Sequence, residues 1–345
     1  MYQAVLLALS TIVAAVPPGT LQSYDTYKSW LVACDNTLSC QAKGFTDGET
    51  RAELSIDREA GADGALTASL SAETTFAAGD VLVDGKPAGL DPKDWKRDDD
   101  GGTTLTTDRA DAVRALVARL RNGTRLSLGG KAEVPLEGFA AAMLRVDDRQ
   151  GRVGGVTALN KPGSAPAWRV PAALLVPHIP AHPISATLAA GEAERLIHAV
   201  RDGQQAVMEK EECESHTGPL TPEAYALDDK RALVMIPCLM GAYQGSSLAF
   251  VAPRGGGPVW RVIAPAPYLG NDPDRTDVDM FTEADFDPAT GMLSMAGKGR
   301  GLADCGMAAS WIWNGDTFQL ASLNLQEACG GVSAGDWPTL FRSEQ

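Results

Sequence analysis

Short apolar runs separated by turn residues characterise the first half of the chain, over residues 24–134. Asp-Gly and Asn-Gly dipeptides stand between the runs, which is typical of antiparallel strands joined by tight turns. The clearest runs are residues 29–33, 52–56, 66–70 and 81–83. This pattern predicts a meander of β-strands.

Two segments of the same half follow a helical period instead. Apolar residues recur at helical spacing over residues 113–120 and again over residues 136–150, and a glycine follows each segment. A glycine just beyond the last periodic residue is a common helix stop. We therefore expect one packed helix at each place.

The second half opens with a third helical pattern at residues 191–202 and then returns to β-like runs. Gly, Pro or Asp separates these runs, which predicts further strands. The runs are residues 233–238, 248–252, 259–264, 292–296, 310–313 and 318–323. Together the patterns predict a mainly β (α+β) protein with a few short helices.

The length and a change of composition divide the chain. At 345 residues it exceeds the usual size of one domain. Residues 161–184 are rich in proline and in apolar residues, and we interpret them as a connection. We expect two β-rich domains, each sandwich- or barrel-like, at residues 24–160 and 185–345.

The first residues resemble an export signal. Residues 4–16 form an apolar run that ends before Pro17-Pro18-Gly19; it is too short for a membrane-spanning helix but long enough for a signal peptide. We predict a signal peptide at residues 1–15 with cleavage after Ala15. A buried first strand is the alternative, because no positive charge precedes the run.

The overall charge excludes one class of function. The chain carries a net charge of −14 with 44% hydrophobic residues, so it has a globular composition but no basic surface for a phosphate backbone. Nucleic-acid binding is therefore not expected. No later segment is long and apolar enough to span a bilayer, so we expect a soluble rather than a membrane-spanning protein.

The six cysteines fall into three pairs that are close in sequence. Even numbers in local pairs favour disulfides, although six cysteines formally allow other connectivities. Such bonds persist in oxidising compartments, which for a bacterial signal peptide means the periplasm, the cell surface or the medium. The expected disulfides are Cys34–Cys40, Cys213–Cys238 and Cys305–Cys329.

Five stretches carry a family resemblance. They are WLVACDNTLSC (30–40), DRQGR (148–152), GAY (241–243), KGRGLADCG (298–306) and WIWNG (311–315). Together they resemble a bacterial family known as domain of unknown function 1176, over nearly the whole expected mature chain. This resemblance implies an exported protein but no particular activity.

Residues 27–146 also resemble the invasion-associated locus B domain. The resemblance rests on the spacing of Trp30, Cys34 and Cys40 and on LEGFAAA (136–142). It implies a β-rich envelope or surface protein with an accessory role, for example in contact with a host protein. The chain departs from many such domains because this half has no second cysteine pair.

The local motif of one enzyme class is missing. The chain has no Ser-x-x-Lys, which is the local signature of penicillin-binding proteins. Cys213, His216 and Cys238 offer a zinc set, but the two cysteines are also expected to form a disulfide. His178 and His182 are separated by Pro180, which excludes the helix that would place both on one metal.

An acidic loop is the candidate calcium site. Counted from Asp272, side-chain oxygens occupy the first, third, fifth and twelfth positions of a calcium-binding loop, with Asp274, Thr276 and Glu283 completing the set. Asp277 stands where the sharp turn needs glycine. The alternative is a solvated Asp/Pro loop without a metal.

The loop that follows residue 297 is the candidate ligand site. Lys298 and Arg300 alternate with glycines and can present cations and backbone donors to a small anion, and Asp304 follows. The spacing is not that of a P-loop, and the alternative is a tight turn against Cys305. No cofactor other than calcium is expected.

These features favour a non-enzymatic envelope protein that binds another envelope protein or a small anionic ligand. One alternative is a periplasmic hydrolase that uses the acidic residues of 272–283 or Asp304. Another is a surface factor that contacts a host protein.

Overall fold

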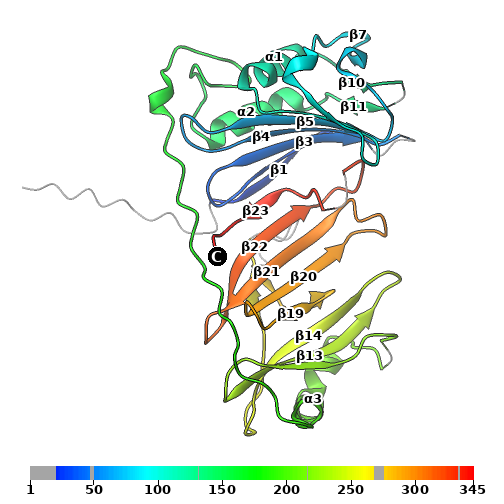
Figure 1. Cartoon of the computed structure of the whole chain (residues 1–345), viewed down its shortest axis with the longest axis vertical. Coiled ribbons are helices and arrows are strands. Elements are labelled where there is room, and N and C mark those ends of the chain that lie inside the picture. Colours follow the sequence, from blue (N-terminus) through cyan, green and yellow to red (C-terminus); the bar gives the residue numbers. More distant parts are fainter. Residues whose placement is uncertain (1–20, 47–49, 131, 216, 268–275, 333–334) are drawn as a thin grey trace, which may run out of the picture.

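The computed structural model describes residues 21–345 except 47–49, 131, 216, 268–275 and 333–334. The predicted signal peptide lies outside the described residues. Antiparallel sheets dominate the rest and form a stack of layers (Figure 1). The prediction of a mainly β protein with a few short helices is confirmed.

The first layer is a seven-stranded sheet with the order β1-β2-β3-β4-β5-β9-β8. Side chains alternate across this sheet, so that one face is apolar and the other is largely polar. The strands are β1 (Ser23–Tyr27), β2 (Trp30–Cys34), β3 (Cys40–Thr46), β4 (Ala52–Arg58), β5 (Leu66–Ala72), β8 (Lys96–Asp98) and β9 (Thr103–Thr107).

Helices and a small sheet cover the apolar face. The helices are α1 (Ala110–Leu120) and α2 (Phe139–Arg149), and the small sheet has the order β11-β10-β6-β7. Trp30 of the large sheet meets the ring of Phe139 edge-on at 4.8 Å between centroids, inside a core built from residues 30–159. The small strands are β6 (Val81–Val83), β7 (Lys86–Pro87), β10 (Arg125–Leu128) and β11 (Glu133–Pro135).

Two further sheets pack face to face in the second half. They enclose a core around Trp311 and Phe281, whose rings lie 5.6 Å apart. One sheet has the order β19-β20-β21-β22-β23, with β19 (Asp285–Asp287), β20 (Met292–Lys298), β21 (Gly306–Trp313), β22 (Phe318–Gln326) and β23 (Thr339–Phe341).

The other sheet has the order β12-β13-β14-β15, and β18 also pairs with β14. Its outer face packs against α3 (Glu192–Gly203), which is followed by the short α4 (Gln205–Lys210). The strands are β12 (Glu223–Ala226), β13 (Arg231–Met240), β14 (Gly245–Pro253), β15 (Trp260–Arg261) and β18 (Phe281–Thr282), beside the separate pair β16 (Ala264–Pro265) and β17 (Asp277–Val278).

The strand predicted at residues 259–264 is reduced to β15 and to the first residue of β16. Val262 and Ala264 are buried, but Ile263 between them is 59% exposed. Pro265 has no N–H to donate to a ladder, and the chain turns to begin a new pairing with β17. The run of apolar residues therefore does not form one continuous strand.

A buried ion pair joins the seven-stranded sheet to the second half of the chain. Lys43 of β3 is fully buried and donates to Glu53 of β4 at 2.6 Å and to Asp336 at 2.7 Å. Burial opposes the charge on Lys43, but the two carboxylates outweigh this effect and raise the pKa of its ammonium group. Since Asp336 precedes β23, this contact fixes the second half to the seven-stranded sheet.

The hairpin closed by Cys34 and Cys40 makes a second junction. The Asn36 amide both accepts from the Arg342 N–H at 2.9 Å and donates to the Arg342 carbonyl at 3.0 Å. The Arg342 guanidinium pairs with the buried Asp35 carboxylate at 2.5 Å. The WLVACDNTLSC stretch therefore fixes the end of the chain.

The proline-rich connection runs down one side of the stack from α2 to α3 (Figure 1). Ile179 is buried against β21 and β22, and its N–H donates to the Glu344 carbonyl at 2.7 Å. Trp168 and Leu175 of the same segment are exposed. The division into two domains at this segment stays a prediction.

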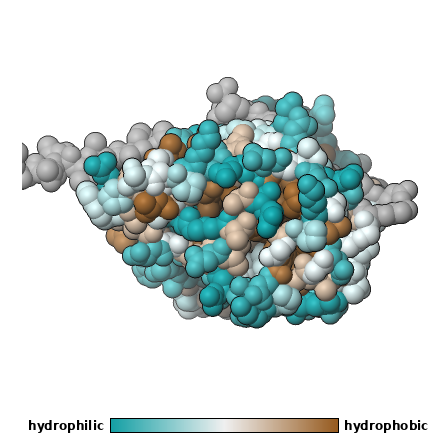
Figure 2. All heavy atoms as spheres, turned by 90° about the horizontal axis from the view of Figure 1, so that it is seen from above, coloured by the Kyte–Doolittle hydropathy of each residue, from teal (hydrophilic) through white to brown (hydrophobic). Residues whose placement is uncertain are grey.

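All three expected disulfides are present: Cys34–Cys40, Cys213–Cys238 and Cys305–Cys329. Among the described residues, no helix is both long and apolar enough to cross a membrane. Figure 2 shows the top of the stack, where hydrophilic side chains surround separate hydrophobic spots. The described residues that are visible on this face therefore form no continuous apolar patch of the kind that marks a docking surface.

Candidate functional site

The structure separates the roles of Lys298, Arg300 and Asp304. The Arg300 guanidinium donates to the Asp304 carboxylate through Nε at 2.8 Å and also through Nη2. Asp304 is fully buried, and the Arg300 hydrogen bonds lower the pKa of its carboxyl group. These two side chains therefore hold the loop together and do not form an open anion site.

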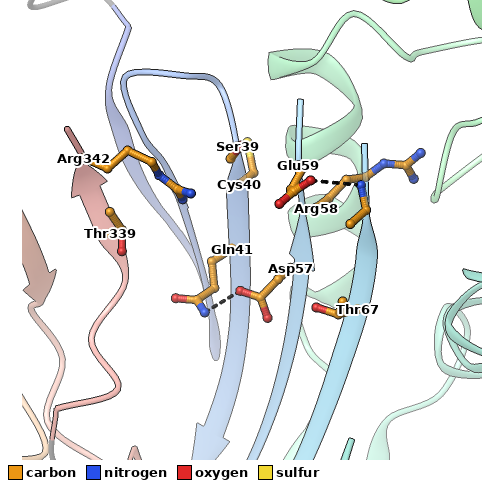
Figure 3. Close-up of a pocket in the computed structure, with 10 residues that line it drawn as sticks. Ser39, Cys40, Gln41, Asp57, Arg58, Glu59, Thr67, Thr339 and Arg342 are labelled. Atoms are coloured by element: carbon orange, nitrogen blue, oxygen red, sulfur yellow. Dashed lines mark hydrogen bonds between the residues drawn. The ribbon is translucent and has the colours of Figure 1, made fainter. Parts of the chain in front are cut away.

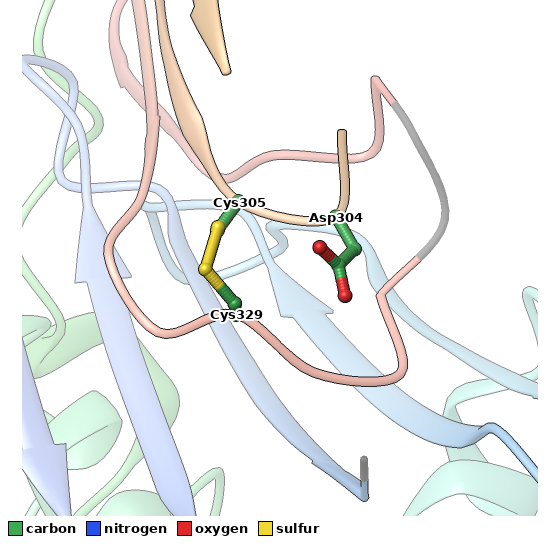
Figure 4. A group of neighbouring side chains, drawn as sticks. All are labelled: Asp304, Cys305 and Cys329. Atoms are coloured by element: carbon green, nitrogen blue, oxygen red, sulfur yellow. A yellow bond between two sulfur atoms is a disulfide. The ribbon is translucent and has the colours of Figure 1, made fainter. Parts of the chain in front are cut away.

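Asp304 lies beside the Cys305–Cys329 disulfide (Figure 4). One ligand atom from each of these three residues falls within 4.8 Å of the others. Both sulfurs are bonded to each other, so neither can act as the thiolate that a soft metal requires. The cluster leaves one carboxylate already paired with Arg300, and we assign no metal to it.

The glycines of the loop permit close packing. A methyl group placed on Gly299 would lie 2.5 Å from the Cys305 sulfur, and one placed on Gly301 would lie 3.3 Å from the ring of Tyr243. Gln244, next to Tyr243, donates to the Lys298 carbonyl at 3.0 Å and accepts from the Lys298 N–H at 2.8 Å. The GAY and KGRGLADCG stretches, far apart in sequence, thus form one structural unit.

A cleft of about 650 Å³ opens beside this unit. It lies at the end of the core between the two sheets of the second half, and β17, β18, β20, β21 and the end of β22 contribute to its walls. The apolar walls come from Met280, Met295, Met307 and Leu325, together with the Cys305–Cys329 disulfide. Methionine is flexible and polarisable, so walls of this kind can adapt to different apolar ligands.

Two polar groups in the lining of the cleft have unused bonding capacity. Lys298 lines the cleft, and its ammonium group forms no ion pair with any carboxylate of the described residues. Gln326 is fully buried, and its Oε1 atom has no hydrogen-bond partner within the described part of the chain. Glu327, the other charged residue of the lining, takes part in an interaction of its own.

The structure does not assemble the calcium loop among the described residues. Asp272 and Asp274 lie outside them. Thr276 is exposed. The Glu283 carboxylate accepts a hydrogen bond from the Gly245 N–H at 2.8 Å, so it binds the first residue of β14. The calcium site stays a prediction.

Neither candidate zinc site has its full set of ligands among the described residues. Cys213 and Cys238 form a disulfide, so neither offers a thiolate, and His216 lies outside the described residues. His178 forms a bridge to Glu344, while the backbone N–H of His182 donates to the Thr290 carbonyl at 2.8 Å. Both histidines thus belong to the extended connection, not to a helix.

The methionines and Gln326 were not identified from the sequence. Met295 lies opposite Ala309, and Gly297 lies opposite Met307, so the two methionines are diagonal neighbours on one face of β20 and β21. The period-2 alternation of these strands identifies the shared face. Only the register, which the sequence does not give, brings the two side chains together.

Comparisons with known proteins identify the family of this chain. The model of the family described as "Protein of unknown function (DUF1176)" matches residues 24–344. The uncharacterised protein YpfG of Escherichia coli (strain K12) is 29% identical over 329 residues, which cover 91% of each chain. No solved structure matches the chain. The chain therefore belongs to the DUF1176 family of proteins of unknown function.

Proposed function

We propose that this protein is exported to the periplasm, where it binds a small ligand with an apolar body and one anionic group in the cleft beside the Cys305–Cys329 disulfide. The observation that carries the proposal is the lining of this cleft: adaptable apolar walls and one lysine that has no carboxylate partner among the described residues. Three disulfides support export because such bonds persist in oxidising compartments.

The arrangement of polar groups favours binding over catalysis. Asp304, the acidic residue of the loop, is buried and paired with Arg300, and it does not line the cleft. Glu327 does line the cleft, but it takes part in an interaction of its own. A general acid or base must reach the reacting atom within hydrogen-bond distance. The hydrolase alternative at residues 272–283 and the host-contact alternative stay predictions.

A pair of matched amphiphiles tests the site. Decanoate and decanol share one apolar chain, but only decanoate carries a charge for Lys298 to contact. A hydrogen bond to a charged group contributes about 1.5–3 kcal/mol, so we expect decanoate to bind about tenfold or more tightly than decanol. Isothermal titration calorimetry of the oxidised protein measures both affinities.

Substitutions assign the preference to the cleft. Lys298→Met should remove the difference between the two ligands while it keeps the apolar affinity. Lys86→Met, an exposed substitution on β7 at the other end of the stack, should leave both affinities unchanged. Failure of both ligands to bind would contradict the proposal. So would a preference for decanoate over decanol that persists unchanged in Lys298→Met.

A further inference from the structure

A second hollow lies on the polar face of the seven-stranded sheet, away from the cleft in the second half. It consists of two cavities, of about 180 Å³ and about 360 Å³, and both are lined by Asp57 and Thr67. The smaller cavity is closed by Thr339 and Arg342 at β23, and the larger one extends to β8 and β9. We call the two cavities together the trough.

The register of the sheet arranges the floor of the trough in rows. Gln41, Asp57 and Thr67 lie opposite one another on β3, β4 and β5, and Figure 3 shows their side chains on the same side of the sheet. In the next row, Ser69 of β5 lies opposite Thr106 of β9. Because neighbouring strands are about 4.8 Å apart, hydrogen-bonding groups recur at that spacing across the floor.

Asp57 is held in place at the centre of the trough. Its carboxylate accepts from the Gln41 amide at 2.5 Å and from the Ser55 hydroxyl at 2.9 Å. Both donors come from the same face of the sheet, so the carboxylate is fixed before any ligand arrives. A carboxylate has more than two acceptor positions, which leaves capacity for a ligand hydroxyl.

The side chains that line the larger cavity carry no formal net charge. Three of them are basic and three are acidic, so the lining favours neither cations nor anions. They are Lys93, Lys96 and Arg109, and Asp57, Asp94 and Asp108. None of the described residues that line either cavity is aromatic, so recognition here depends on hydrogen bonds.

We infer that the trough binds a neutral oligosaccharide. A sugar chain carries hydroxyl groups that both donate and accept, and it has no net charge, so it matches a floor of carboxylate, amide and hydroxyl groups with balanced charges. An extended chain can cross the strands from β23 to β9 and meet one row of polar groups at each step. This site is separate from the cleft and goes beyond the proposed function.

Titration of the oxidised protein with maltotetraose and chitotetraose, followed by NMR or calorimetry, tests this inference. Thr67→Val with Ser69→Ala removes two floor hydroxyls and should lower the affinity about tenfold. Ser71→Ala is the matched control: Ser71 lies on the same face of β5 but outside both cavities. It should leave the affinity unchanged, as should Lys298→Met.

Several outcomes would overturn the inference. These are a lack of binding by either saccharide at millimolar concentration, an affinity that the double variant does not lower, and tighter binding of tetragalacturonate than of the neutral sugars. Selective binding of an unstructured peptide in place of saccharides would assign the trough to another class of ligand. Loss of Lys298-dependent decanoate binding with intact saccharide binding would contradict the proposed function alone.

Discussion

The buried ion pair at Lys43 gives the sharpest prediction for stability. The Lys43 side chain is 0% exposed and that of Glu53 is 5% exposed, whereas that of Asp336 is 56% exposed. Lys43→Met would leave the Glu53 carboxylate buried without its cation, and such a change typically costs about 3–5 kcal/mol. Because whole domains are stable by about 5–15 kcal/mol, the loss should be plain in urea unfolding at pH 7.

Two control variants separate this charge effect from general disruption. Lys43→Met combined with Glu53→Leu replaces the buried pair by apolar groups and should recover most of the loss. Asp336→Asn removes only the half-exposed partner and should cost less than about 1 kcal/mol.

The cost of Lys43→Met should also depend on pH. Burial raises the pKa of Glu53 above its ordinary value of 4.5, and without Lys43 no cation opposes this effect. A carboxyl group whose pKa is higher in the folded state stabilises that state fully at pH values below its unfolded-state pKa. This stabilisation is lost as the pH rises through the folded-state pKa. The single variant should therefore regain stability towards pH 4.5. A cost under about 1 kcal/mol at pH 7, or a double variant as unstable as the single one, would refute this reasoning.

Three further predictions follow from packing, covalent links and charge. Gly44→Ala places a methyl group on the Trp30 ring and should cost about 1–3 kcal/mol in urea unfolding, whereas Gly79→Ala, with open space around it, should be nearly neutral. Removal of the 213–238 disulfide by a double alanine substitution should lower the free energy of unfolding by about 3.5 kcal/mol on the chain-entropy model; no change would contradict a stabilising role. Asp304→Asn should lower the melting temperature at neutral pH, because the Arg300 pair lowers the pKa of Asp304. The difference should shrink below the ordinary aspartate value of 3.8 and vanish as the pH falls through the lowered pKa of Asp304.

Helices and strands whose apolar residues recur at a regular spacing were predicted from the sequence. The helical spacing at residues 113–120 corresponds to α1 (Ala110–Leu120), and the run at residues 66–70 corresponds to β5 (Leu66–Ala72). β3 was not predicted, because Lys43 in its middle is typical of a turn or a surface. The second half of the chain supplies Asp336 to that lysine, and no local pattern shows such a distant partner.

The candidate site was predicted in part. The spacing of Lys298, Arg300 and Asp304 located the loop, but it did not show that Arg300 would pair with Asp304. The cleft was not predicted either, because Met280, Met295 and Met307 come from separate segments of the sequence. Strand register, which the sequence leaves open, decides which side chains share a wall.

Native mass spectrometry of the protein isolated from the periplasm without reductant tests the central claim most directly. We predict a chain that has lost residues 1–15 and six thiol hydrogens, from its six cysteines. We also predict that it carries a small ligand, whose occupancy Lys298→Met lowers and Lys86→Met leaves unchanged. A chain found in the cytoplasm with free thiols would contradict export. A bound ligand that Lys298→Met retains in full would contradict binding in the cleft.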